Sequence, residues 1–290
     1  MKKKIFGLLG ILLMTIACGL SAPATPTQPN IETVVAGTLQ ALTSAVPATQ
    51  TPVSGTTITV NNISFVIPTE IGSGAQAETI EAVPPSSDMP WWEIAPAYNK
   101  YLIQGYPLVE TFHKPAVYVY PVDEYIQANA DMAVLFDKLK MILNNPNQPL
   151  PENLPFLPAF NAGQIFYSNT QTVNFQSGAG IRYITQYAQA SVPINNTEAF
   201  YTFQGLTHDG KYYIAAVLPI SAATLVADGN INSVTPTGGI PFDWNPEAYE
   251  LMPAYIDSVT QMLNATDPNA FNPTLPILDA LIQSITIHSQ

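Results

Sequence analysis

The sequence contains a single cysteine, Cys18, so no disulfide can form within the chain. A fold without disulfides depends on its apolar core for stability. The chain is 47% hydrophobic over 290 residues, which is enough apolar material for one large domain or two small ones. We therefore expect a globular body that is held together by packing alone.

Basic residues are also few. Lysine and arginine together number 9, against 21 aspartate and glutamate residues, and the formal net charge is −12. Nucleic acids and anionic lipid surfaces attract basic segments, so the composition argues against nucleic acid as a partner and against a polybasic membrane contact. The acidic residues are scattered along the chain, which indicates a solvated acidic surface rather than an acidic tail.

The motifs of common enzyme and metal sites are missing. The three histidines, His113, His208 and His288, show none of the spacings of zinc sites, and no nucleophile elbow, P-loop or dinucleotide fingerprint occurs. The sequence therefore predicts no catalytic residue, no metal site and no cofactor, and it leaves open whether the protein is an enzyme. His113 is expected at an exposed strand entry, and His208 is expected in a hairpin turn.

The first eighteen residues have the pattern of an export signal. Three lysines at positions 2–4 precede an uncharged apolar run from Ile5 to Ile16, then Ala17 and Cys18. The run suits a signal peptide and is too short to span a bilayer. An ordinary secretory signal followed by an unrelated cysteine is one interpretation of this pattern.

Residues 15–18, Thr-Ile-Ala-Cys, resemble the bacterial lipobox, with Thr15 where leucine is usual. The resemblance implies cleavage before Cys18, so that residues 1–17 are a signal peptide, and lipidation of the Cys18 sulfur. Two or three acyl chains hold a protein stably on a membrane. The resemblance thus places the protein at the cell membrane as a lipid-anchored lipoprotein that faces outside the cytoplasm.

Residues 18–56 are rich in proline, threonine, alanine and serine, a composition that is typical of a flexible, disordered linker. Within this tether, residues 31–46 have the spacing of a short amphipathic helix, although an isolated helix of that length is marginal in water. Two interpretations stay open: a spacer that lifts the following domain off the membrane, or a leader whose only property is its length.

Residues 57–290 have the pattern of a single globular domain. Asn61-Asn62 and Asp209-Gly210 each separate two β-rich runs and predict hairpins. Asp123 and Glu124 open a helical pattern, where carboxylates favour the helix dipole. Residue periodicity predicts strands at 57–60, 63–67, 77–83, 101–104, 116–120, 182–187, 200–206 and 211–218, and helices at 123–143, 246–263 and 275–285.

Other segments are expected to be less regular. Five prolines make residues 146–158 irregular. Residues 178–180, Gly-Ala-Gly, are interpreted as a turn before a strand, and residues 222–227 are expected to add a helical turn. Pro253 predicts a kink or a late start for the helix at 246–263.

This order of elements predicts an α+β fold, in which helices pack on an antiparallel sheet. Ile63–Pro68, with the sequence ISFVIP, and Leu278–Ile285, with the sequence LDALIQSI, flank the predicted sheet. The layout resembles the PsbP-like sandwich. Because most members of that family are non-enzymatic or uncharacterised, the resemblance implies a protein without catalysis, although a fold alone does not establish a function.

Trp91 and Trp92 are the candidate ligand-binding residues. Adjacent residues of a strand point to opposite faces, so one of the two is expected to be exposed. An exposed tryptophan, together with the 14 tyrosines of the chain, could line a groove for a sugar or an aromatic ligand. The alternative is aromatic packing beneath proline-rich loops.

Residues 228–233, Asp-Gly-Asn-Ile-Asn-Ser, match the first half of a calcium-binding loop. The sixth position is Ser233 rather than glycine, and the twelfth is Gly239 rather than glutamate. An ordinary turn rich in aspartate and asparagine fits these departures better.

Three functions stay open at this point. The first is a non-catalytic binding or interaction module whose ligand or protein partner the sequence does not identify. The second is an extracytoplasmic hydrolase with dispersed residues, which a deep pocket that gathers His113 or His208 with an acid would favour. The third is an accessory subunit of a membrane-associated assembly, which a large exposed apolar patch would favour.

Overall fold

The computed structural model describes residues 54–243 and 251–288, all of which belong to the compact unit Pro52–Gln290. The predicted signal peptide, Cys18 and all but the last residues of the predicted tether lie outside the described residues, as does the start of the helix predicted at 246. The described unit contains antiparallel sheets and four α-helices. The predicted α+β class, with helices on an antiparallel sheet, is therefore confirmed.

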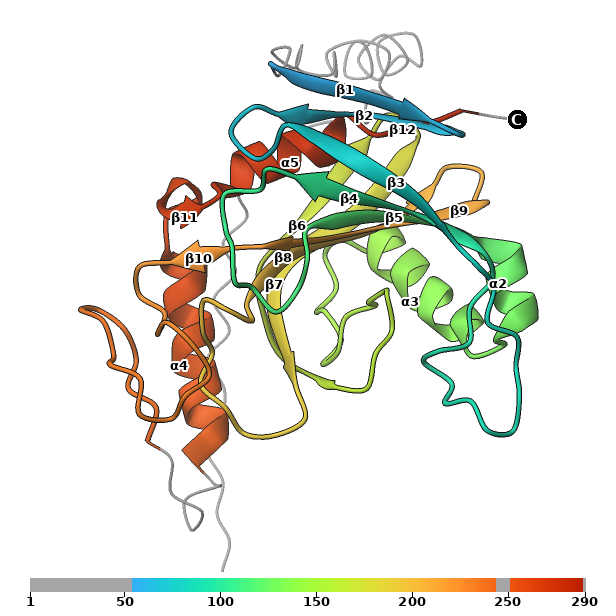
Figure 1. Cartoon of the computed structure of the whole chain (residues 1–290). Coiled ribbons are helices and arrows are strands. Elements are labelled where there is room, and N and C mark those ends of the chain that lie inside the picture. The colour runs from blue at the N-terminus through green and yellow to red at the C-terminus, as the bar shows by residue number, and fades with distance from the viewer. Residues whose placement is uncertain (1–53, 244–250, 289–290) are drawn as a thin grey trace, which may run out of the picture. The chain divides into compact units, whose positions relative to one another are not determined.

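A seven-stranded antiparallel sheet with the order β3-β4-β5-β9-β8-β7-β6 forms the centre of this unit (Figure 1). Its strands are β3 (Gly74–Ile80), β4 (Tyr98–Gln104), β5 (Ala116–Pro121), β6 (Gly163–Phe175), β7 (Gly178–Ala188), β8 (Phe200–Thr207) and β9 (Tyr212–Pro219). Smaller antiparallel sheets join β1 (Gly55–Val60), β2 (Ile63–Pro68) and β12 (Thr286–Ile287), and β10 (Ser221–Ala222) with β11 (Phe271–Asn272).

Helices cover both faces of the central sheet (Figure 1). On one face lie α2 (Val122–Ala128) and α3 (Met132–Asn144), and on the other lie α4 (Met252–Ala265) and α5 (Leu275–Gln283), the latter preceded by the short 3₁₀ helix η2 (Pro268–Ala270). Strands covered on both sides lose the alternation of buried and exposed residues. Accordingly, every residue of β8 is buried.

Two apolar cores follow from this arrangement. The core on the α4 and α5 side includes the helix face that the sequence predicts, formed by Leu278, Leu281, Ile282 and Ile285, all fully buried. The core on the other side contains Phe136 and Leu139 of α3 against Tyr213 of β9. Both the hairpin at Asn61-Asn62 and the hairpin at Asp209-Gly210 form as predicted.

The only arginine of the chain, Arg182 in β7, is buried. Its Nε lies 3.3 Å from Oδ1 of Asp279 in α5, and its Nη2 donates to Gln171 of β6 at 2.6 Å. The same Asp279 oxygen accepts a hydrogen bond from the Tyr201 hydroxyl at 2.9 Å. Removing one partner of a buried ion pair is strongly destabilising, and these contacts join the last helix to β6, β7 and β8.

The single helix predicted at 123–143 is wrong, because the chain forms two helices with a break at residues 129–131. The buried Asn129 ends α2, and its backbone N–H donates to the Tyr125 carbonyl. Asp123 and Glu124 do lie in the first turn of α2, but no side chain caps that helix.

Three further expectations need correction. Gly178 and Gly180 belong to β7 rather than to a turn, because both pair with β6 and β8. Glycine is needed at these positions because a Cβ atom would meet the rings of Phe175 and Phe203 at about 2.5 and 2.4 Å. The helical turn expected at 222–227 is the end of β10 followed by irregular turns. Strand β6, at the edge of the sheet, is not predicted from the sequence at all.

Candidate functional site

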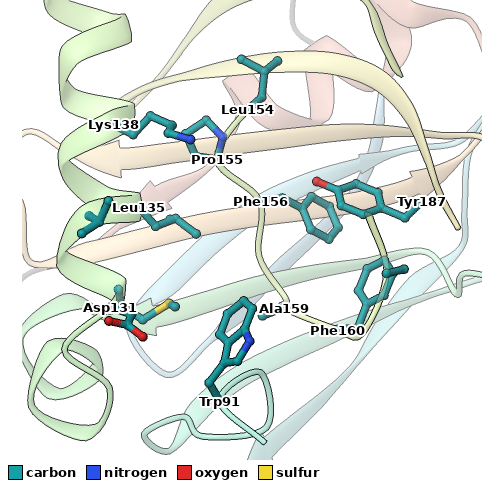
Figure 2. Close-up of a pocket in the computed structure, with 13 residues that line it drawn as sticks. Trp91, Asp131, Leu135, Lys138, Leu154, Pro155, Phe156, Ala159, Phe160 and Tyr187 are labelled. Atoms are coloured by element: carbon teal, nitrogen blue, oxygen red, sulfur yellow. The ribbon is translucent and has the colours of Figure 1, made fainter. Parts of the chain in front are cut away.

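A cavity of about 510 Å³ lies beside α3 (Figure 2). Ten of its thirteen lining residues are apolar or tryptophan, and the other three are one acid, one lysine and one tyrosine. The lining residues are Trp91, Asp131, Met132, Val134, Leu135, Lys138, Leu154, Pro155, Phe156, Ala159, Phe160, Ala162 and Tyr187. This size and this mixture of many apolar groups with a few polar ones are typical of small-molecule sites.

Two walls of different chemistry face each other across the cavity (Figure 2). Helix α3 and its N-cap residue Asp131 form one wall. Asp131, Leu135 and Lys138 share a face because they follow one another at intervals of three or four residues. The opposite wall is aromatic. The rings of Phe156 and Tyr187 are 4.6 Å apart, and that of Phe160 lies 5.1 Å from Tyr187.

Phe156 of the aromatic wall belongs to the proline-rich segment at 146–158, which has no regular secondary structure, as predicted, and Phe160 follows directly after that segment. Backbone N–H and carbonyl groups of the segment bond to buried side chains of the sheet instead of to a neighbouring strand. Gln204 of β8 accepts from the Leu157 N–H at 2.9 Å and donates to the Leu157 carbonyl at 3.0 Å. The Tyr183 hydroxyl donates to the Pro155 carbonyl at 2.7 Å. Because every partner comes from the central sheet, the wall is held in place before any ligand arrives.

Trp91 closes one end of the cavity (Figure 2). Contrary to expectation, Trp91 and Trp92 lie in a turn rather than in a strand, and their rings meet edge to face at 5.9 Å. The Asn129 side chain donates to the Trp91 carbonyl oxygen at 2.9 Å. The break between α2 and α3 thus provides the amide that positions Trp91.

The two tryptophans have different surroundings. Trp91 is 50% exposed and lines both the cavity and a neighbouring hollow, to which Trp92 also contributes. The two spaces also share Phe160 and Ala162. The structure therefore places Trp91 in the cavity and Trp92 only in the space beside it.

His113 is half-buried beside this aromatic wall, not exposed as expected. Its ring lies 4.3 Å from that of Phe200, 5.6 Å from Phe160 and 4.9 Å from Phe112. Burial among these rings lowers the pKa of His113 from 6.5 to about 4, because an apolar environment disfavours the charged imidazolium. His113 does not line the cavity.

His208 lies in the β8–β9 turn, as predicted, beside a polar hollow that Asp209 and His288 also line. The His288 ring is 3.0 Å from the Ser64 hydroxyl, a separation that suits a nucleophile and its base. The Asp209 carboxylate, however, accepts from the Thr207 hydroxyl at 2.7 Å and from the Lys211 N–H at 3.1 Å. It is thus engaged in the turn and does not orient a histidine.

The 228–233 segment forms turns closed by its own side chains. Asp228 Oδ1 accepts hydrogen bonds from the Asn230 N–H, at 3.0 Å, and from the Ser233 hydroxyl. These bonds account for the lowered pKa of Asp228. Within residues 54–243 and 251–288, no group of three or more histidine, cysteine, aspartate or glutamate residues is placed to hold a metal ion.

Large apolar side chains are exposed at several places. Val134 and Met141 lie on α3, and Val109 and Phe112 lie on the β4–β5 loop. Val134 also lines the cavity, and Met141 lines a further hollow, of about 320 Å³, that shares Lys138 with it. None of the helices in the described part of the chain is long and apolar enough to cross a membrane.

Sequence reasoning identified Trp91 but missed the rest of the cavity. Phe156 lies in the segment 146–158, which was predicted only to be irregular, Phe160 lies just beyond it, and Tyr187 is near the end of the distant strand β7. The one available signal was the presence of two phenylalanines near prolines, because large aromatic residues are uncommon in exposed loops and indicate that a segment is packed against the protein. Comparison with protein-family models, with curated proteins and with solved structures finds no match for this chain.

Proposed function

We propose that this protein is a non-catalytic binding module, held at the outer face of a cell membrane by a lipid on Cys18, whose ligand occupies the cavity beside α3. The observation that carries the binding role is the preformed aromatic wall, which the sheet holds through Gln204 and Tyr183. The support for the location is the lipobox-like sequence before Cys18.

Binding is tested with a neutral aromatic dye, N-phenyl-1-naphthylamine, on the chain from residue 18 onward carrying Cys18→Ser, which has neither the lipid nor the apolar signal run. We expect saturable fluorescence enhancement with one dye per chain. Trp91→Ala should weaken binding about fivefold, since one aromatic contact contributes about 1 kcal/mol. Phe112→Ala is the matched control, because it removes an exposed ring outside the cavity. Equal affinities of parent and Trp91→Ala would refute the assignment of the cavity.

The location is tested by metabolic labelling with a radioactive fatty acid. The wild-type protein should be labelled and should sediment with membranes, whereas Cys18→Ala should show neither property. Equal labelling of both proteins would exclude Cys18 as the anchor.

A second function, an accessory subunit that docks another protein, is favoured by one observation. Val134 and Met141 of α3 are 69% and 61% exposed, although both are large apolar residues, and contiguous exposed apolar surface marks interaction sites. The substitution Met141→Lys, at an exposed residue that does not line the cavity, would abolish partner capture in crosslinking experiments. If it abolishes membrane-protein crosslinks and leaves dye binding intact, docking is the function of this helix.

A further inference from the structure

Lys138 differs from most cations of the described unit in having no acidic partner. Its Nζ donates to the Asn153 carbonyl oxygen at 3.3 Å, and among the residues described no carboxylate oxygen lies within 4.0 Å of it. An ammonium group has three N–H donors, so two remain for a ligand. The cations that do have a carboxylate within that distance are Lys100, Lys140, Arg182 and Lys211.

The charges of the lining are separated along the cavity. In Figure 2 the Lys138 side chain extends from α3 toward Pro155, at the end opposite Trp91, whereas Asp131 lies at the Trp91 end. The two are seven positions apart in the sequence, which corresponds to about 10 Å along the axis of α3. An anionic group is therefore attracted to one end of the cavity and repelled from the other.

We propose that the ligand of this cavity is a hydrophobic monoanion, an apolar body with a single carboxylate or sulfonate group that binds at Lys138 Nζ. The body lies between α3 and the rings of Phe156, Phe160 and Tyr187, with Trp91 at its far end. A ligand with several anionic groups would meet Asp131 as well as the net charge of −12. This inference rests on the proposed function, because it names the ligand class of the same cavity.

Two dyes with one aromatic body test this proposal. 8-Anilinonaphthalene-1-sulfonate carries one anionic group, and N-phenyl-1-naphthylamine is the same molecule without it. Both are titrated into the chain from residue 18 onward carrying Cys18→Ser, alone and with Lys138→Gln or Lys140→Gln. Lys140 is the matched control, because it lies on the same helix, is exposed, and already pairs with Asp137 at 3.0 Å. Dye that binds elsewhere on the protein contributes equally to all variants and does not affect the comparison of their affinities.

We expect Lys138→Gln to weaken sulfonate binding about tenfold, the effect of one charge-assisted hydrogen bond, and to leave the neutral dye within about twofold. Lys140→Gln should leave both dyes unchanged within the same limits. Raising the salt from about 0.05 to about 0.5 M should weaken sulfonate binding to the parent more than to Lys138→Gln. Salt screens the attraction between the Lys138 ammonium and the sulfonate, which only the parent has.

The two proposals fail in different ways. If Lys138→Gln weakens both dyes equally, or if Lys140→Gln weakens the sulfonate as much as Lys138→Gln does, the anionic site at Lys138 is overturned while cavity binding stands. If neither dye binds the parent saturably, the binding function fails, and the ligand class fails with it. Urea unfolding of each variant checks that a weakened affinity does not reflect a damaged fold.

Discussion

Acidification should destabilise this protein through His113. The folded protein holds the His113 pKa at about 4, against 6.5 for an exposed imidazole. Between these two values the unfolded chain carries a proton that the folded protein does not, so the free energy of unfolding falls as the pH falls. The full difference corresponds to about 3 kcal/mol, and below about pH 4 both states are protonated and the effect ends.

The substitution His113→Phe isolates this contribution. A phenyl ring suits a position between Phe112, Phe160 and Phe200 and cannot be protonated. Urea unfolding should give similar free energies for parent and variant at about pH 7, whereas at about pH 4.5 the variant should be more stable by about 2–3 kcal/mol. His208→Gln, in an exposed turn, is the control and should follow the parent. A constant difference between parent and His113→Phe at both pH values would refute the argument.

Two further predictions concern buried polar groups, and urea unfolding measures both. Asp279→Asn should lower the free energy of unfolding by about 3–5 kcal/mol, because it leaves the Arg182 charge buried without its counterion. The double variant Arg182→Met with Asp279→Leu should lose less stability, and a larger loss would contradict this reasoning. Gln204→Leu should lower the free energy of unfolding by about 2–5 kcal/mol, because the buried Leu157 N–H and carbonyl and the Tyr213 hydroxyl lose their partner. It should also weaken dye binding, and an unchanged affinity would show that the aromatic wall does not need Gln204.

The elements that sequence reasoning predicted correctly are those whose cause is local. Asn61 has a φ of 56° and Gly210 a φ of 70°, and these residue types favour the turns that such angles require. The apolar stripe of α5 is fully buried, so the spacing of its apolar residues in the sequence correctly indicated which residues lie in the core. In each case a few consecutive residues contain the whole reason for the structure.

The failures have causes that lie elsewhere in the chain. The break at Asn129 contains no proline or glycine, and its buried amide is satisfied by Trp91, which lies far away in the sequence. Strand β6 is largely polar because it is an edge strand with many exposed positions, so the alternation that marks a strand is weak. Pairing with β7, which no local pattern reveals, makes it a strand.

The cavity contains residues that can be recognised locally in the sequence and residues whose placement depends on distant parts of the chain. Trp91 was identified because a large aromatic residue near the surface is informative on its own. Phe156, Phe160 and Tyr187 form a wall only because Gln204 and Tyr183 hold the proline-rich segment against the sheet. Lys138 is one of eight lysines in the sequence, and only its position among apolar groups without a carboxylate distinguishes it from the others.

The burial of the only arginine also makes it an indicator of the state of the chain. Trypsin cleaves after lysine and arginine, and Lys211 is exposed beside the β8–β9 turn of the native protein. The bond after Arg182 lies inside β7, between β6 and β8, so the protease reaches it only after the sheet has come apart. At a trypsin concentration high enough for cleavage to outpace reclosing, the product that ends at residue 182 therefore appears at the rate at which the sheet opens around β7.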